Sequence, residues 1–197
     1  MGGGAHGVPK RAWWPRDGRF VVPALAAAAV LLVVVPLSYQ QGLRHATDGS
    51  AAMVTEAVTD HLRVLSSQHP LDVESGGIHQ VRPWFAGRLD FAPEVPFVSD
   101  EDFPLRGGAI GYFLDRKAAV FVYGHRMHTI SLFVFRPEGF AWPTRTLRPL
   151  GRGRAYETTA RGFTVLLWRA GELGYALVSD LDPPDLFGLA IKLSGEA

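Results

Sequence analysis

The chain has 197 residues, which indicates one domain with an appendage. Its formal net charge is only +1, so the overall charge gives no reason to expect a nucleic-acid partner. It contains no cysteine, which excludes disulfides, thiolate catalysis, cysteine-type zinc sites and iron–sulfur clusters. This absence leaves the compartment open, because a cysteine-free domain folds on either side of a membrane.

A long apolar run comes first along the chain. Residues 20–38 read FVVPALAAAAVLLVVVPLS, nineteen residues without a charge. At about 1.5 Å of rise per residue, a helix of this length comes close to the ~30 Å thickness of a bilayer core. The run therefore predicts a single transmembrane helix. A cleaved signal peptide is the alternative, but its apolar part is usually shorter and ends at a small-residue cleavage site, which the following LSYQQGLRH does not offer.

The charges beside this run set the predicted orientation. Residues 1–19 carry four lysine or arginine side chains and one aspartate, so the positive-inside rule places them in the cytoplasm. We therefore expect a short basic cytoplasmic tail over residues 1–19, a transmembrane helix over 20–38, a membrane-proximal linker and helix over 39–69, and an extracytoplasmic sensor-like domain over 70–197.

The membrane-proximal part is predicted to be helical from Asp48 to His69, and Pro70 ends this helix. Its apolar positions recur at helical spacing. They are Val54, Val58, Leu62 and Leu65, whereas Glu56, Asp60 and Arg63 fall on other faces. The helix follows the apolar run closely, so it could transmit a signal, and it is equally suited to be the first core helix of the domain.

Alternating apolar residues and polar turns predict five strands in the outer domain. They are Gly108–Leu114, Ala118–Tyr123, Thr129–Arg136, Gly162–Arg169 and Leu173–Ser179, and a last helix follows from Asp182 to Leu193. The predicted fold class is α+β, with an antiparallel sheet of five or six strands and flanking helices. Residues 137–161 carry five arginines, which with their prolines and glycines predicts a long mobile loop.

Catalytic motifs are missing from the sequence. There is no G-x-S-x-G, H-E-x-x-H, Walker or dinucleotide-binding pattern. We therefore expect no enzymatic activity and no cofactor.

Three histidines are candidate metal ligands. His125 and His128 lie three residues apart around a predicted hairpin turn, where two imidazoles can converge, and His79 is the third candidate for a zinc or copper site. The competing interpretation is that these histidines are packed or hydrogen-bonded, because His128 shares the alternation of the apolar residues that follow it. No acidic or cysteine ligand lies in the same stretch.

The densest stretch of unusual residues is HQVRPWFAGRLDF, from His79 to Phe91, called the corner segment below. Its composition predicts a structural corner. Pro83 restricts Arg82 to extended geometry. Trp84 and Phe85 anchor the turn in the core, and Gly87 permits a backbone turn that other residues resist.

The polar members of the corner segment leave a functional alternative open. Arg82, Arg88 and Asp90 are placed to pair around the turn. Where they are exposed, together with His79, they would form a recognition surface for a signal molecule, a partner or a regulatory protease. The stretch is thus a candidate interaction site as well as a structural corner.

The corner segment is the first of an ordered series of motifs. An F-P-L-x-G-G stretch, a strand of the type H-x-I-x-L-F-V, a late tryptophan strand and S-D-L before the last helix follow it. The residues are His79, Val81, Arg82, Pro83, Trp84, Phe85, Gly87, Arg88, Leu89 and Phe91; Phe103, Pro104, Leu105, Gly107 and Gly108; His128, Ile130, Leu132, Phe133 and Val134; Trp168; and Ser179, Asp180 and Leu181. This series resembles the extracytoplasmic domain of bacterial transmembrane anti-sigma factors, over residues 54–193.

The resemblance implies a location and a function. The protein is expected in the bacterial inner membrane, with its C-terminal domain in the periplasm, as a regulator of an extracytoplasmic-function sigma factor in stress response. The implied partners are the membrane, a sigma factor bound directly or through a separate cytoplasmic chain, and a regulatory protease. The alternative is a periplasmic ligand- or metal-binding module without control of a sigma factor.

The sequence departs from the family at its cytoplasmic end. Members of the family usually carry a zinc-binding anti-sigma domain there with an H-x3-C-x2-C motif, whereas this chain has no cysteine and nineteen residues before the apolar run. Such a short segment does not bury a core. Three explanations stay open: a start codon assigned too late, a truncated relic, or a sensor subunit whose cytoplasmic partner is a separate chain.

Overall fold

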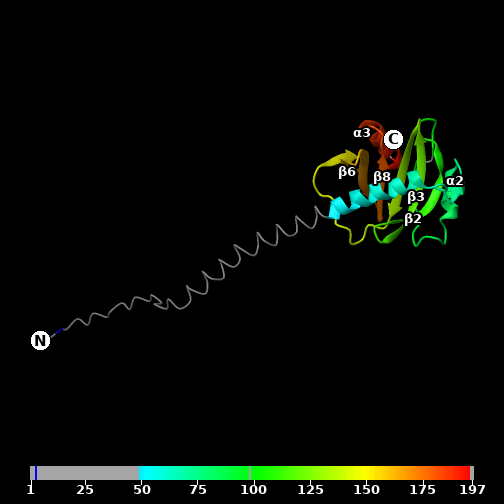
Figure 1. Cartoon of the computed structure of the whole chain (residues 1–197). Coiled ribbons are helices and arrows are strands. Elements are labelled where there is room, and N and C mark those ends of the chain that lie inside the picture. Colours follow the sequence, from blue (N-terminus) through cyan, green and yellow to red (C-terminus); the bar gives the residue numbers. More distant parts are fainter. Residues whose placement is uncertain (1–2, 4–48, 98, 196–197) are drawn as a thin grey trace. The chain divides into compact units, whose positions relative to one another are not determined.

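The structure is a computed structural model that describes residues 3, 49–97 and 99–195 (Figure 1). Within these residues the domain is built on one eight-stranded antiparallel sheet with three helices. The first helix is described over residues 49–66. The other elements are β1 (Val73–Glu74), α2 (Ile78–Trp84), β2 (Leu105–Phe113), β3 (Arg116–His125), β4 (His128–Phe135), β5 (Leu147–Leu150), β6 (Gly153–Ala160), β7 (Phe163–Ala170), β8 (Leu173–Ser179) and α3 (Pro183–Leu193).

The sheet consists of two four-stranded meanders that meet in the middle. Its strand order is β1-β2-β3-β4-β8-β7-β6-β5, so the last strand of the first meander pairs with the last strand of the second. The central β4–β8 ladder runs from Ser131 opposite Val178 to Phe135 opposite Gly174. An irregular segment and α2 connect β1 to β2, whereas short turns connect the other consecutive neighbouring strands, as antiparallel pairing allows.

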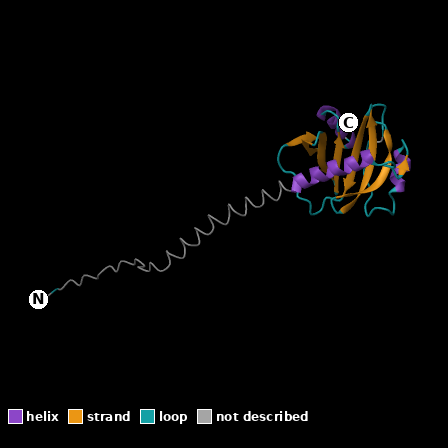
Figure 2. Ribbon diagram, in the orientation of Figure 1, coloured by secondary structure: helices purple, strands orange, loops and turns teal. Residues whose placement is uncertain are grey.

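Both faces of the sheet are buried. In β3 the residues Ala119, Phe121 and Tyr123 belong to one apolar cluster, and the alternate residues Ala118 and Val120 belong to the other. The first helix crosses one face of the sheet, while α3 lies on the opposite side (Figure 2). Burial on both faces explains why the central strands are apolar at nearly every position.

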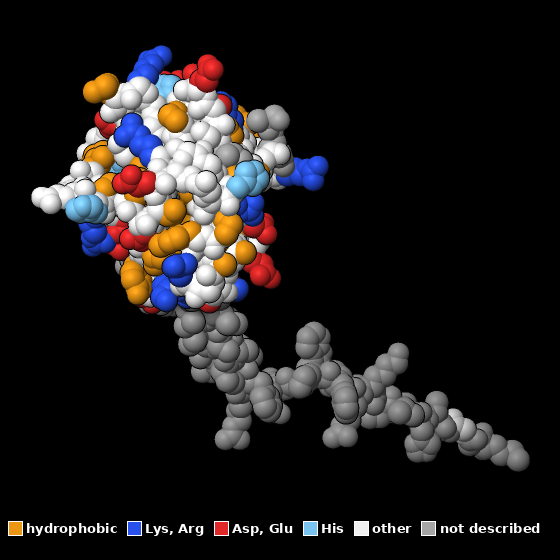
Figure 3. Space-filling view, turned by 90° about the vertical axis from the view of Figure 1, so that its right-hand side faces the viewer, with side chains coloured by type: hydrophobic (Ala, Val, Ile, Leu, Met, Phe, Trp, Pro, Cys, Tyr) orange, Lys and Arg blue, Asp and Glu red, His pale blue; other side chains and the backbone are white. Residues whose placement is uncertain are grey.

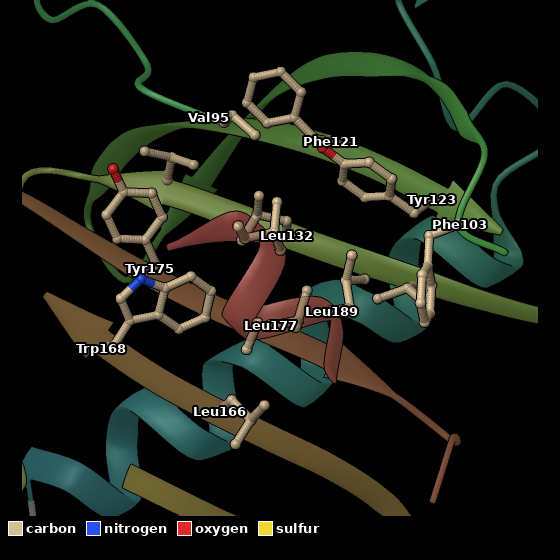
Figure 4. Close-up of a cluster of buried hydrophobic side chains, with 14 of the residues drawn as sticks. Val95, Phe103, Phe121, Tyr123, Leu132, Leu166, Trp168, Tyr175, Leu177 and Leu189 are labelled. Carbon is tan, nitrogen blue, oxygen red and sulfur yellow. The ribbon is translucent and has the colours of Figure 1, made fainter. Parts of the chain in front are cut away.

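The face that carries α2 and α3 is rich in aromatic side chains (Figure 4). Trp168 of β7 and Tyr175 of β8 stack with their ring centroids 5.0 Å apart and their planes 6° apart. The Tyr175 hydroxyl donates a hydrogen bond to the carbonyl oxygen of Glu94, and burial raises the pKa of Tyr175 to about 12. Tyr175 therefore fastens the irregular segment before β2 to the middle of the sheet.

The predicted fold class was wrong. The five predicted strands coincide with β2, β3, β4, β7 and β8, but the described residues form eight strands, so the sheet exceeds the predicted five or six. The predicted long loop over 137–161 contains β5 and β6. β5 is the edge strand and β6 is its neighbour, and exposed residues such as Arg148 and Arg154 replace in them the apolar alternation by which strands are recognised.

The membrane-spanning part of the predicted fold class is not supported either. The predicted tail over 1–19, apart from Gly3, the predicted span over 20–38 and the linker up to residue 48 lie outside the described residues. Within the part of the chain that is described, no helix has the length and the apolar character needed to cross a membrane.

Candidate functional site

The corner segment begins as a short helix. In α2 the amides of Gln80 and Val81 bond to the carbonyl oxygen of Gly77. Pro83 lies inside α2, so Arg82 is helical and the predicted extended geometry of Arg82 was wrong. A proline is tolerated here because the helix is ending: the following amides bond three residues back, as Phe85 does to Arg82.

Gly87 ends this helical turn as the sequence predicted. Its φ is +74°, in the left-handed region that favours glycine. The amides of Arg88 and Leu89 both bond to the carbonyl oxygen of Phe85. The backbone then leaves the sheet toward an irregular segment that ends at β2.

The apolar half of the corner segment packs on the second glycine of the F-P-L-x-G-G motif. A Cβ on Gly108 of β2 would lie 2.9 Å from Cγ1 of Val81 and 3.0 Å from Cζ of Phe85. The glycine therefore lets α2 lie directly on β2. Two motifs that are separated in the sequence thus form one structural unit.

The two aromatic residues of the corner segment have different environments. Phe85 is 1% exposed and its ring centroid is 5.1 Å from that of Phe121, so it belongs to the core as predicted. Trp84 is only partly buried. Its ring lies edge-on to Phe85, with the ring centroids 5.3 Å apart, and it carries the Arg88 guanidinium 4.6 Å from its own ring centroid.

The polar half of the corner segment faces solvent. The exposed members are His79, Gln80, Arg82, Pro83, Ala86, Gly87, Arg88 and Asp90. The predicted pairing of Arg82, Arg88 and Asp90 was wrong, since no ion pair joins these three side chains anywhere in the described residues. Asp90 instead pairs with Arg136 at the end of β4, with 3.8 Å between Oδ2 and Nε.

Most of these exposed residues border two open depressions of about 580 and 660 Å³. The first is lined by residues from Arg82 to Pro93. The second lies between the end of the corner segment and the β2–β3 and β4 strand ends. It is lined by Gly87, Arg88, Leu89, Asp90, Arg116, Lys117 and Arg136.

We call Arg88, Arg116, Lys117 and Arg136 the basic cluster. Acidic neighbours offset part of its charge, because Glu138 contacts both Arg116 (3.5 Å) and Arg136 (3.8 Å). The view onto the end of the molecule where α2 lies shows basic and acidic side chains interspersed with apolar ones (Figure 3). Such a mixed and open surface suits a protein or peptide partner better than an enclosed substrate.

The three candidate metal ligands have other partners or surroundings. His125 stacks on Phe103, with 4.8 Å between ring centroids, and its Nδ1 lies 2.7 Å from the carbonyl oxygen of Asp102. His128 Nδ1 lies 2.9 Å from Oδ1 of Asp180. His79 is exposed on α2. In residues 49–97 and 99–195 no three histidine or acidic side chains gather closely enough to hold a metal ion.

The contact between His128 and Asp180 joins two of the motifs. Burial acts to raise the pKa of Asp180, but the hydrogen bond and the charge of His128, together with hydrogen bonds from the Asp180 amide and the Ser179 hydroxyl, hold that pKa below its usual value. This pair therefore links the start of β4 to the S-D-L stretch before α3.

Several residues of the candidate site were not predicted from the sequence. The corner segment was predicted, but the basic partners on the strands were not, because their approach depends on the β2–β3 and β3–β4 hairpins. The signal that could have found Arg116 and Lys117 is their place in a polar turn. Asp60 and His61 of the first helix were also missed as buried groups; they are 5% and 0% exposed.

No protein-family model matches the chain, and no curated protein matches it. Among solved structures, the crystal structure of a GTP binding regulator from Thermotoga maritima is similar over 49% of this chain and 82% of that chain, at 14% sequence identity and a TM-score of 0.37. A similarity at this level carries no argument about fold or function.

Proposed function

We propose that the chain is a membrane-anchored regulator of the anti-sigma type, and that its folded domain binds a partner at the basic cluster. The observation that carries the proposal is that the corner segment has a packed apolar side and an exposed charged side. Val81 and Phe85 pack on Gly108, whereas Arg88 and Asp90 face solvent beside the basic residues of β3 and β4.

The ordered motifs support the regulatory part of the proposal. Their resemblance to the outer domain of transmembrane anti-sigma factors spans most of the folded domain, and the contacts of Gly108 and of Asp180 give these motifs a shared structural role. The apolar sequence of residues 20–38 supports anchoring in the inner membrane. Control of an extracytoplasmic-function sigma factor, directly or through a separate cytoplasmic chain, follows from the same resemblance.

The experiment uses the source organism. Deleting the gene is expected to change the transcription of one extracytoplasmic-function sigma regulon, and the wild-type full chain restores it. The double variant R88E/K117E reverses two exposed charges of the basic cluster and is expected to lose this restoration. The matched control R126E/R145E reverses two exposed arginines elsewhere and is expected to restore transcription fully.

Two outcomes count against the proposal. Unchanged transcription of every such regulon after deletion would remove the control of a sigma factor. Full restoration by R88E/K117E would remove the basic cluster as the partner site. Membrane levels of each variant, measured by immunoblot, separate loss of binding from loss of protein.

A further inference from the structure

A further pocket lies on the other face of the sheet, beside the end of the first helix. It has a volume of about 340 Å³, within the range of small-molecule sites. Its apolar lining includes Val64 of the helix, Ala109 of β2, Val120 of β3 and Phe133 of β4. Gly111 also lines it, and a Cβ at this position would lie 2.7 Å from Cγ2 of Val120, so the glycine keeps part of the pocket open.

A buried carboxyl group lines this apolar pocket. Asp60 is 5% exposed, and its Oδ1 bonds to Arg63 one helical turn further on. Its Oδ2 is buried and has no hydrogen-bond partner among the described residues. A buried acceptor without a donor is unfavourable, so a ligand that brings a donor to this oxygen gains a favourable contact.

We propose that this pocket binds a small organic cation, an ammonium group on an apolar body, with Asp60 as the anionic partner and Val64, Val120 and Phe133 around the body. This site is separate from the basic cluster and does not depend on the control of a sigma factor. Its position beside the first helix would let a ligand change the contact of that helix with the sheet.

The charges around the pocket favour a cation over an anion. Two carboxylates line it, since Asp72 joins Asp60, and the Asp72 Oδ2 accepts a hydrogen bond from the Ile110 amide. The arginine in the lining, Arg63, has a side chain that is 66% exposed, so it can swing into solvent. An incoming ammonium would take its place, whereas an anion would face the buried carboxyl of Asp60.

The protonation of Asp60 makes this binding depend on pH. Burial and the charge of Glu56 raise its pKa to about 6, although Arg63 acts in the opposite direction. The other titratable groups of the pocket lining are His69, Asp72 and Tyr112. Because only the ionised carboxylate attracts a cation strongly, affinity for an ammonium ligand falls as the pH drops through 6.

The test is calorimetric titration of the full chain in lipid nanodiscs, with empty nanodiscs as the blank. The probes are benzylammonium, the neutral benzyl alcohol and the anionic benzoate. At pH 7.5 benzylammonium is expected to bind at least tenfold more tightly than the other two. At pH 5 its affinity is expected to be about tenfold lower, since about one tenth of the Asp60 carboxyl groups are then ionised at a pKa of about 6.

Variants locate the site. Asp60→Asn is expected to weaken benzylammonium binding at least tenfold at pH 7.5 and to abolish its pH dependence. Arg63→Gln removes the competing cation and is expected to tighten binding several-fold. Asp115→Asn changes an exposed aspartate of the β2–β3 turn, and Gly188→Ala changes a glycine of α3 with open space around it; both are expected to bind as wild type.

Three results would overturn the proposal. The first is equal affinity for benzylammonium and benzyl alcohol, which would mean that the charge is not recognised. The second is an Asp60→Asn variant that binds as wild type. The third is the absence of saturable binding of benzylammonium up to about 10 mM, which corresponds to a free energy too small for a built site.

Discussion

The two faces of the sheet are buried to a similar extent but with different chemistry. The face covered by α2 and α3 is packed with aromatic and aliphatic side chains, and the charged residues of its corner segment remain at the surface. The face covered by the first helix buries a carboxyl group and an imidazole at successive positions, Asp60 and His61. The first face is suited to hold a binding surface rigidly. The second face makes stability depend on pH, because it buries two groups that can gain or lose a proton.

Burial shifts the pKa values of Asp60 and His61 in opposite directions, because in each case it favours the neutral form. Burial raises the pKa of Asp60 to about 6, so this carboxyl group keeps its proton up to a higher pH in the folded state than in the unfolded state. Burial lowers the pKa of His61 to about 4, so the folded state favours the neutral imidazole as well. The Nδ1 of His61 lies 2.8 Å from the hydroxyl oxygen of Ser131 in β4, and its Nε2 has no hydrogen-bond partner in the described part of the chain.

The largest expected effect concerns the packed face. Phe85→Ala removes a side chain that is 1% exposed and packs against Phe121 and Gly108. The free energy of unfolding is expected to fall by about 3–5 kcal/mol. Urea unfolding of the full chain in mild detergent, followed by tryptophan fluorescence, measures it. Trp84→Ala, at a partly exposed neighbour, is the control with a smaller loss; an equal or larger loss there would contradict the inward role of Phe85.

The second effect separates the two buried groups by their pH dependence. Between pH 4 and 6 the folded state holds a proton on Asp60 that the unfolded state has released, so this group makes the protein less stable as pH rises. Between pH 4 and 6.5 the unfolded state holds a proton on His61 that the folded state lacks, so this group makes the protein less stable as pH falls. Each contribution is about 3 kcal/mol over its window, and the two oppose each other.

Replacing one of the two groups therefore reveals the pH dependence of stability that the other group causes, which largely cancels in the wild type. Asp60→Asn is expected to lose stability as the pH falls from 6.5 to 4, and His61→Asn is expected to gain stability over the fall from 6 to 4. The wild type is expected to change least. Urea unfolding at half-unit pH intervals measures the slopes, and the constant offset of each substitution does not affect them. Parallel slopes in all three proteins would show that neither group is the source.

The difference between the faces also explains what the sequence could predict. The alternation of apolar residues predicted a strand over Ala118–Tyr123, and in the structure Ala118 and Val120 belong to one apolar cluster while Phe121 and Tyr123 belong to the other. Periodicity succeeds there because burial on both sides dictates the residue types. It failed for the edge strand β5 and its neighbour β6, whose exposed and half-exposed residues leave little apolar signal.

Only part of each candidate site could be predicted from the sequence. The corner segment stands out by its composition, yet the approach of Arg136 to Asp90 joins residues 46 positions apart, and this depends on the register of the sheet. The first helix was oriented by Val54, Val58, Leu62 and Leu65, but Leu65 is 47% exposed. The sequence placed Asp60 away from the apolar side of the helix, because a charged residue is assigned to solvent unless its partners are known. In the structure Asp60 lies on the buried side.

The third expected effect tests the close approach of α2 and β2. Gly108→Ala adds a methyl group that would lie 2.9–3.1 Å from Val81, Phe85 and the carbonyl oxygen of Val120, so stability is expected to fall by about 1–3 kcal/mol. Gly188→Ala in α3 has open space around the added methyl and is expected to be neutral or to stabilise by up to about 1 kcal/mol. The difference in thermal midpoint between the two variants measures the constraint. Equal midpoints would remove Gly108 as the contact that joins the two motifs.

The smallest effect on stability belongs to the basic cluster, and this makes the cluster suitable for functional tests. Arg88 lies over the Trp84 ring at the surface, a contact worth about 0.5–1 kcal/mol. Arg88→Gln is therefore expected to lower the free energy of unfolding by no more than this amount, and Lys117→Gln, at an exposed residue whose Nζ lies 3.5 Å from the Arg88 carbonyl oxygen, by less. Urea unfolding provides both values. A loss above about 2 kcal/mol for Arg88→Gln would mean that Arg88 holds the corner segment together, and the loss of function expected for R88E/K117E would then have a structural cause.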